Sequence, residues 1–275
     1  KENEYDMFLK EIKTEILRER IDRIDRLNNI RKKYLSDFYI VIYGKNELDL
    51  DNATINVSSE INKCGISTKI LERRDVAVFL KYSYSRNFDE REVKDISDDE
   101  LVNWIKPNEV EFFSNHYVID GVDASCLAVS DFPLRVKNAW GSELFNIPNT
   151  KAVLHFKPVE KYKAIKRIDK CISEMETKEI MSEKARESMN SLLDSLQAEN
   201  ETLFDVTLTI TAFNYLDDSN YKKNVRRAML LGNFRPSTLY GLQVEGFKSA
   251  NISPISTLTQ QERGINSSSL AAVFP

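Results

Sequence analysis

The chain has 275 residues, of which 41% are hydrophobic and 30% are charged, with only eight glycines and seven prolines. This composition predicts a globular protein with a real core and excludes collagen-like, low-complexity and intrinsically disordered proteins. The formal net charge of -4 gives no global attraction to nucleic acid or anionic lipid, so binding to either requires a local basic patch.

Three cysteines, Cys64, Cys126 and Cys171, lie far apart among apolar neighbours. Their odd number and irregular spacing predict reduced thiols in a cytoplasmic setting instead of a disulfide framework. The chain has no run of about 20 apolar residues, so we expect it not to cross a membrane by itself. Lys1 in place of Met suggests that upstream residues were removed, which leaves room for a membrane anchor outside this sequence.

The first segment, residues 1–36, is predicted to be an amphipathic helical arm. It contains no Gly or Pro, and apolar residues such as Leu9, Ile12 and Ile16 recur at three- and four-residue steps. Such a helix either packs on its own domain or a neighbouring helix, or binds a partner.

Residues 37–148 are predicted to form a first α+β subdomain. Residues 38–43 are strand formers followed by a glycine, a pattern typical of a central strand buried on both faces. We then expect a helix over 51–64, a strand over 66–70 and a helix over 76–82.

Two local signals are expected in the rest of this subdomain. Ser97 and Glu100 have the spacing of a capping box ahead of a helix that begins near Leu101. Asp120 and Gly121 form a dipeptide typical of a β-hairpin turn, and this hairpin is expected to close the subdomain.

Residues 149–275 are predicted to form a second α+β subdomain. We expect strands over 152–156, 204–212 and 237–242, and helices over 162–175, 182–198 and 217–231. In the middle strand, Thr207, Thr209 and Thr211 alternate with apolar residues, which predicts one face exposed to water. The element order is ferredoxin-like in outline. The whole chain is therefore expected to be an α+β protein of mixed sheets with packed helices and a long N-terminal helix.

No residue pattern indicates catalysis or metal binding. None of the eight glycines begins the Gly-x-x-x-x-Gly-Lys-Ser/Thr run of a P-loop. His116 and His155 lie in strand-like segments without a second His or Cys at ligand spacing, which disfavours zinc. Ser219 and Lys222 fit a Ser-x-x-Lys pattern but lack the companion motifs of acyl-enzymes. We therefore expect no enzyme activity, metal or cofactor on this span.

The helix expected over 217–231 carries the densest positive charge, and Asp217 or Asp218 is its expected N-cap. Its cations are Lys222, Lys223, Arg226 and Arg227, with Arg235 close behind. The plain interpretation is a solvated helix face. The functional interpretations are contact with an acidic partner, with lipid headgroups or with the phosphates of a nucleic-acid strand.

Two sets of residues resemble one protein family. The first consists of Gln243, Glu245, Phe247 and Ser249, followed by Arg263, Ser267, Ser268, Ala271, Phe274 and Pro275. The second covers 117–122 and 127–133 and ends at Trp140. In order and spacing they are similar to the conjugative type IV secretion ATPases of the CagE/TrbE/VirB group, which include TraE and TrsE relatives. One departure is Gly246, where relatives often carry Ala, and glycine there weakens a helix by up to about 1 kcal/mol.

The resemblance implies a non-catalytic N-terminal docking and assembly domain of an ATPase for conjugative DNA transfer. In that family the last segment leads into a motor domain, so we expect ATP and Mg²⁺ to bind outside this sequence. The implied partners are inner-membrane secretion-channel subunits, the motor domain and neighbouring copies, with a cytoplasmic location peripheral to the inner face of the cell membrane.

Candidate contact residues under this interpretation are Lys222, Lys223, Arg226, Arg227, Arg235, Gln243 and Phe247. The alternative function is a nucleic-acid-binding module that uses the basic helix around Arg226.

Overall fold

The computed structural model describes residues 39–43, 46–85, 88–132, 137–177, 183–198, 201–251, 253 and 256–273. Contacts within the chain divide it into two compact units, Lys1–Ile40 and Val41–Pro275, and all the described helices and strands belong to the second. The helical arm expected over 1–36 lies outside the described residues.

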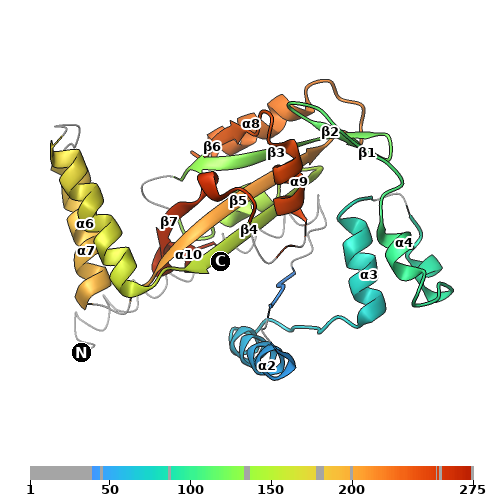
Figure 1. The fold of residues 1–275 in the computed structure, drawn as a ribbon, viewed down its shortest axis with the longest axis horizontal. Coiled ribbons are helices and arrows are strands. Elements are labelled where there is room, and N and C mark those ends of the chain that lie inside the picture. The colour runs from blue at the N-terminus through green and yellow to red at the C-terminus, as the bar shows by residue number, and fades with distance from the viewer. Residues whose placement is uncertain are drawn as a thin grey trace, which may run out of the picture. The chain divides into compact units, whose positions relative to one another are not determined.

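The described strands form one sheet in the order β1-β2-β3-β5-β4, in which β6 also pairs with β3 and β7 with β5 (Figure 1). The strands are β1 Val110–Phe112, β2 Tyr117–Ile119, β3 Val122–Asp131, β4 Thr150–Pro158, β5 Leu203–Phe213, β6 Arg235–Thr238 and β7 Arg263–Asn266. The α+β class is confirmed. The pairs among these strands are all antiparallel, so the sheet is not mixed.

The sheet takes strands from both sides of the subdomain boundary predicted at residue 148. Strand β3, from the first predicted subdomain, pairs with β5 and β6 from the second. A central strand needs hydrogen-bond partners on both edges, and here these partners come from distant parts of the sequence. The two predicted subdomains therefore share one sheet.

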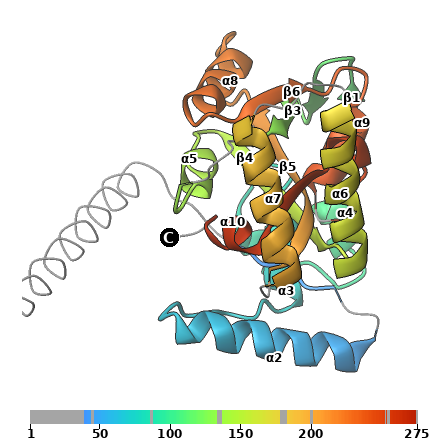
Figure 2. The ribbon, with the colours of Figure 1, turned by 90° about the vertical axis from the view of Figure 1, so that its left-hand side faces the viewer.

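The described α-helices are α2 Glu47–Lys63, α3 Arg73–Tyr82, α4 Leu101–Ile105, α5 Gly141–Phe145, α6 Lys161–Thr177, α7 Glu183–Ala198, α8 Tyr221–Leu231, α9 Gln243–Ala250 and α10 Ser267–Ala271, with short 3-10 helices η1 Glu90–Lys94 and η2 Thr259–Gln261. Of these, α5, α8 and α9 pack on the faces of the sheet. Figure 2 shows α5 and α8 on one side of the sheet and α9 on the other. Because side chains alternate along a strand, Leu127 and Val129 of β3 pack with α5 and α8, while Cys126 and Ala128 face α9.

Helices α6 and α7 lie side by side and have a small apolar core of their own, built around Ala164, Ile168 and Leu196 (Figure 1). Two successive helices return the chain in the opposite direction, so β5 lies antiparallel to its neighbour β4. In addition, β3 and β4 are both antiparallel to β5, while β5 and β6 are both antiparallel to β3, so β3–α5–β4 and β5–α8–β6 each join two parallel strands through a helix. With the strand order β6-β3-β5-β4, these elements have the ferredoxin-like outline, but its first strand, β3, comes from the first predicted subdomain, and α6 and α7 are inserted between β4 and β5.

Several local predictions are confirmed. The helices expected over 51–64, 76–82, 162–175, 182–198 and 217–231 are present within a few residues, as are the strands expected over 152–156 and 204–212. The strand expected over 237–242 ends early, at Thr238, because the chain turns into α9. Asp120 and Gly121 both have positive φ, 46° and 79°, in the hairpin between β2 and β3. The backbone N–H of Ser97 donates to Glu100 at 3.4 Å, which is one half of the expected capping box.

Two strand predictions are wrong. Residues 39–43 and 66–72 are irregular, and their aliphatic side chains lie largely in solvent, with Ile40 64% and Ile70 67% exposed. Strand-forming residues become a strand only when a neighbouring strand accepts their hydrogen bonds and covers their side chains. The central places of the described sheet are taken by β3 and β5.

The water-exposed face expected for β5 is also wrong. Thr207, Thr209 and Thr211 are all buried, with at most 2% of any of them exposed. The alternation is real, but α9 packs over the threonine side of the strand. Threonine is compatible with either environment, so alternation alone does not distinguish solvent from a covering helix.

Candidate docking surface

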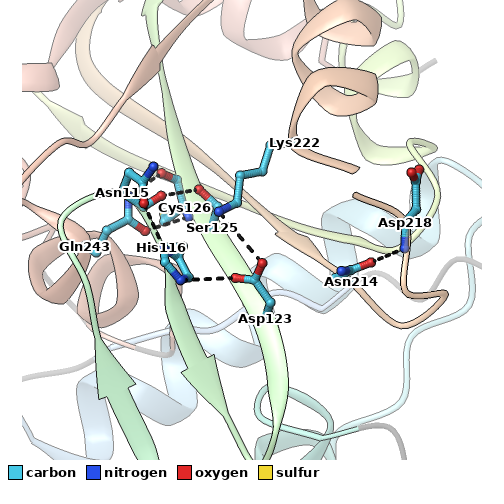
Figure 3. Close-up of polar contacts among 9 residues, drawn as sticks. All are labelled: Asn115, His116, Asp123, Ser125, Cys126, Asn214, Asp218, Lys222 and Gln243. Carbon is cyan, nitrogen blue, oxygen red and sulfur yellow. Dashed lines mark hydrogen bonds and ion pairs between the residues drawn. The ribbon is translucent and has the colours of Figure 1, made fainter. Parts of the chain in front are cut away.

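Helix α8 begins at a polar loop whose side chains hold its first turn. Asn220 is the N-cap residue, and the carboxylate of Asp218 accepts hydrogen bonds from the Asn220 backbone N–H at 2.8 Å and from Asn224 Nδ2 at 2.9 Å. Asn214 in turn accepts from the Asp218 backbone N–H at 2.7 Å (Figure 3). Asp218, one of the two predicted caps, therefore stabilises the helix start without being its N-cap.

One side of α8 is bound to the sheet. Tyr221, Val225 and Met229 recur every four residues and are buried in the core shared with β3 and β5. Fully burying an apolar side chain of this size stabilises the fold by about 1.5–3 kcal/mol. This stripe orients the helix and thereby decides which of its cations face outward.

Lys222 points back toward the sheet. Its Nζ lies 3.8 Å from Asp123 Oδ2 on β3 and 5.3 Å from the centre of the Tyr221 ring. Figure 3 shows Asp123 between Lys222 and His116, whose Nε2 lies 3.9 Å from Asp123 Oδ1. Burial and the nearby Asp123 carboxylate raise the pKa of Tyr221 above its ordinary value. Lys222 thus neutralises a half-buried carboxylate of its own chain.

Arg226 and Arg235 also have partners within the molecule, although both are exposed. Arg226 Nη1 donates to Thr238 Oγ1 at 2.7 Å, which connects α8 to β6. Arg235 Nη1 lies 3.3 Å from Asp131 Oδ2, across the β3–β6 pair. Exposed pairs of this kind contribute little stability, up to about 1 kcal/mol.

Lys223 and Arg227 are exposed, and no carboxylate of the described residues lies within ion-pair distance of either. One turn after Arg227 come Leu230 and Leu231, which are 57% and 76% exposed. Helical spacing places these residues together on the side of α8 opposite the buried stripe. We call Lys223, Arg227, Leu230 and Leu231 the outer face of α8.

The two leucines of this face are not among the contact residues predicted from the sequence. A signal for them was available, because Leu230 and Leu231 follow Arg227 by three and four residues and so share its side of a helix. Without the sheet, however, neither leucine can be told from a core residue.

Gln243, predicted as a contact residue, lies inside the molecule and is only 1% exposed. Its Oε1 accepts from the Cys126 backbone N–H at 3.0 Å, and its Nε2 donates to the backbone oxygens of Cys126 at 3.1 Å and Leu239 at 3.0 Å (Figure 3). These bonds occupy backbone groups of β3 that face no neighbouring strand. Gln243 therefore attaches α9 to the sheet.

Phe247, the other contact residue predicted on α9, belongs to an aromatic cluster. Its ring centre lies 5.2 Å from that of Tyr117, 5.5 Å from that of Phe112 and 5.9 Å from that of Tyr84. Such ring pairs stabilise the fold by more than the burial of their apolar area alone. Phe247 thus holds α9 against the β1–β2 hairpin.

A partly buried lysine, Lys151, lies between β4 and the end of α9. Lys151 Nζ donates to the Ser83 backbone oxygen at 2.9 Å and to Asn251 Oδ1 at 2.7 Å, both uncharged acceptors. Burial lowers the pKa of Lys151 to about 7, with the Cys126 thiol acting weakly in the opposite direction. The lysine joins the segment after α3 to the sheet. No carboxylate of the described residues lies within ion-pair distance of Lys151.

One cavity of about 450 Å³ lies between the α3–α4 segment and the β2–β3 hairpin. Its wall includes Trp104 and Phe88, whose rings meet edge to face at 5.5 Å. The carboxylates in the wall already have partners, since Glu92 accepts from the Trp104 indole at 3.4 Å and Asp120 accepts from two backbone N–H groups. We assign no catalytic pair to this cavity.

The described residues contain no group of three or more His, Cys, Asp or Glu side chains arranged to hold a metal ion. Among the same residues, no helix combines the length and the apolar character that crossing a bilayer requires. A scan against models of protein families finds no match to the chain, and a search of curated protein sequences also finds none.

Proposed function

We propose that this chain is the docking and assembly domain of a conjugative type IV secretion ATPase, peripheral to the inner face of the cell membrane. In this proposal the motor that binds ATP is a separate domain, and this domain connects it to inner-membrane channel subunits and to neighbouring copies. The single observation that carries the docking role is the outer face of α8, where unpaired cations lie beside two exposed leucines.

This mixed surface favours a protein partner over nucleic acid. Phosphates would neutralise Lys223 and Arg227 but would leave Leu230 and Leu231 uncovered. A protein interface covers apolar side chains at its centre and places charges around them. The outer face also has no aromatic side chain on which a base could stack, and the threonines of β5 are covered by α9.

The family part of the proposal is supported by where the matching residues lie. The indole Nε1 of Trp140 donates to the Ser269 backbone oxygen at 2.9 Å, and the backbone N–H of Gly141 donates to the Val273 oxygen at 3.1 Å. Gln243 bonds to Cys126. Trp140 and Gln243, two residues that carry the resemblance, thus each contact a distant segment of one framework, as expected if they belong to a common fold.

Gly246, the departure from the family pattern, has a steric explanation. A Cβ at this position would lie 2.8 Å from Leu239 Cδ1 and 2.9 Å from Cys126 Cβ. Helix α9 therefore approaches β3 more closely than an alanine allows without movement. Relatives with alanine are expected to hold this helix slightly farther from the sheet.

Site-specific photocrosslinking tests the docking role. A photoreactive residue replaces Arg227 in the full-length protein in its native host, and a matched variant carries it at Tyr162, an exposed position on α6. We expect adducts with membrane-channel subunits or neighbouring copies from position 227 and few from position 162. Adducts only with DNA at position 227 would replace docking by the nucleic-acid function.

A further inference from the structure

Helix α2 carries a second exposed face, which is complementary to the outer face of α8. None of its side chains is buried, and Leu48 and Ile55 are 70% and 65% exposed. Asp51 lies between them on the same side of the helix, since the three are spaced at three and four residues. We call Leu48, Asp51 and Ile55 the outer face of α2.

The two helices have opposite charge. Helix α2 has four carboxylates and a single lysine, Lys63, which pairs with Glu60 at 2.6 Å. Helix α8 has four cations and no carboxylate. Asp51 on α2 and Arg227 on α8 both lack an ion-pair partner among the described residues. The outer face of α2 therefore offers one unpaired charge and that of α8 offers two, in each case beside exposed aliphatic side chains.

The charged and aliphatic residues are also spaced alike along the two helices. When Arg227 is placed against Asp51, Leu230 and Leu231 lie one turn farther along α8. They then meet Ile55 if the helices run parallel, or Leu48 if they run antiparallel. In either orientation, aliphatic side chains cover each other while the charge pair fixes the register.

We propose that the outer face of α8 on one copy of this chain binds the outer face of α2 on a second copy. The contact joins two different surfaces, so the first copy keeps its α2 face free and the second keeps its α8 face free for further copies. Such head-to-tail contacts build rings when the rotation closes and open chains when it does not. This inference rests on the proposed docking function, because it names one partner of the same α8 surface.

Two charge-reversal variants, measured separately and as a mixture, test this interface. Asp51→Lys and Arg227→Asp are each made in the 275-residue chain, and self-association is measured by sedimentation at several protein and salt concentrations. Asp51 is preferred to Asp49 because Asp49 takes part in the cap of α2 with Asn46. Circular dichroism and urea unfolding check that each variant is folded.

We expect the unmodified chain to associate reversibly and more weakly at high salt. Each single variant should lower the association constant by roughly tenfold or more, because like charges then face each other. An equimolar mixture of the two variants should recover association, since the reversed α8 face of one variant and the reversed α2 face of the other again carry opposite charges. Glu160→Lys, an exposed reversal outside both faces, is the matched control and should leave association unchanged.

Three results would overturn the proposal. These are an unmodified chain that stays monomeric at high concentration, single variants that associate as well as the unmodified chain, and a mixture of folded variants that does not recover. Photocrosslinking at position 227 distinguishes this failure from that of the proposed function. Adducts with channel subunits alone would sustain docking while removing self-association through α2.

Discussion

Helices α8 and α9 lie on opposite faces of one sheet and use their polar side chains in opposite ways. On α9, Gln243 and Ser249 are buried, and Gln243 makes three hydrogen bonds inside the molecule. On α8, Lys223 and Arg227 point outward beside two leucines that no described residue buries. A polar side chain on an amphipathic helix therefore shows its role only when the covering surface is known.

The largest expected effect comes from breaking the polar attachment of α9. Gln243→Leu leaves the backbone N–H and C=O of Cys126 buried without partners, at a cost of about 3 kcal/mol in the free energy of unfolding. Urea unfolding measures the change. Val244→Ala, at a more exposed position on the same helix, is the control and should cost much less. Equal losses for both variants would mean that Gln243 has no special role.

A second test concerns Lys151, which lies on the α9 side of the sheet and makes the free energy of unfolding depend on pH. Its pKa is about 7 in the folded protein, below the ordinary lysine value of 10.5. The unfolded state therefore binds more protons between these values, and stability rises with pH by up to about 1.4 kcal/mol per pH unit.

The measurement compares the unmodified chain with Lys151→Met by urea unfolding from pH 7 to pH 8. This window ends below the ordinary cysteine pKa of about 8.5, above which the Cys126 thiol of the unfolded state ionises and reverses the trend, because burial raises the pKa of Cys126 to about 12 in the folded state. Lys151→Met should lower the absolute stability, since Ser83 and Asn251 lose their donor, and flatten the slope. If the free energy of unfolding of Lys151→Met changes with pH as steeply as that of the unmodified chain, Lys151 is not the source of the pH dependence.

A smaller loss is expected where α9 meets β3 most closely. Gly246→Ala improves helix propensity by up to about 1 kcal/mol. The added methyl group overlaps Leu239 and Cys126, and crowding of this kind typically costs about 1–3 kcal/mol. We expect a net destabilisation in thermal unfolding. In a Leu239→Ala background, Gly246→Ala should cost less stability than it does in the unmodified chain, because the added methyl group then meets fewer atoms. A stabilised Gly246→Ala variant would show that α9 has room to move.

The smallest effect on stability is expected on α8. Lys223→Glu and Arg227→Glu should change the free energy of unfolding by no more than about 0.5 kcal/mol, because neither cation has a partner within the described chain. Photocrosslinked adducts at Leu231 should nevertheless decrease when Arg227 is reversed. Lys222→Glu is the contrasting variant, since it brings a carboxylate toward Asp123 and should cost more stability. Equal stability of all three variants would contradict the difference between the two sides of α8.

Much of the local structure was predictable because its causes are local. The periodicity of Tyr221, Val225 and Met229, the hairpin at Asp120 and Gly121, and the pairing of Ser97 with Glu100 depend on residues within a few positions of one another. The sheet order was not predictable in this way, since β3 obtains its partners other than the hairpin neighbour β2 from β5 and β6, far along the chain.

The sequence by itself determined the α+β class, most helices and the concentration of cations around Arg226. Only the tertiary structure decided that residues 39–43 and 66–72 are not strands, that Thr209 is buried, that Gln243 is a core residue and that Leu230 joins Arg227 at the surface. The physical reason is that helix periodicity and caps arise from neighbours in sequence, whereas strand pairing and burial depend on which distant segment supplies the second surface.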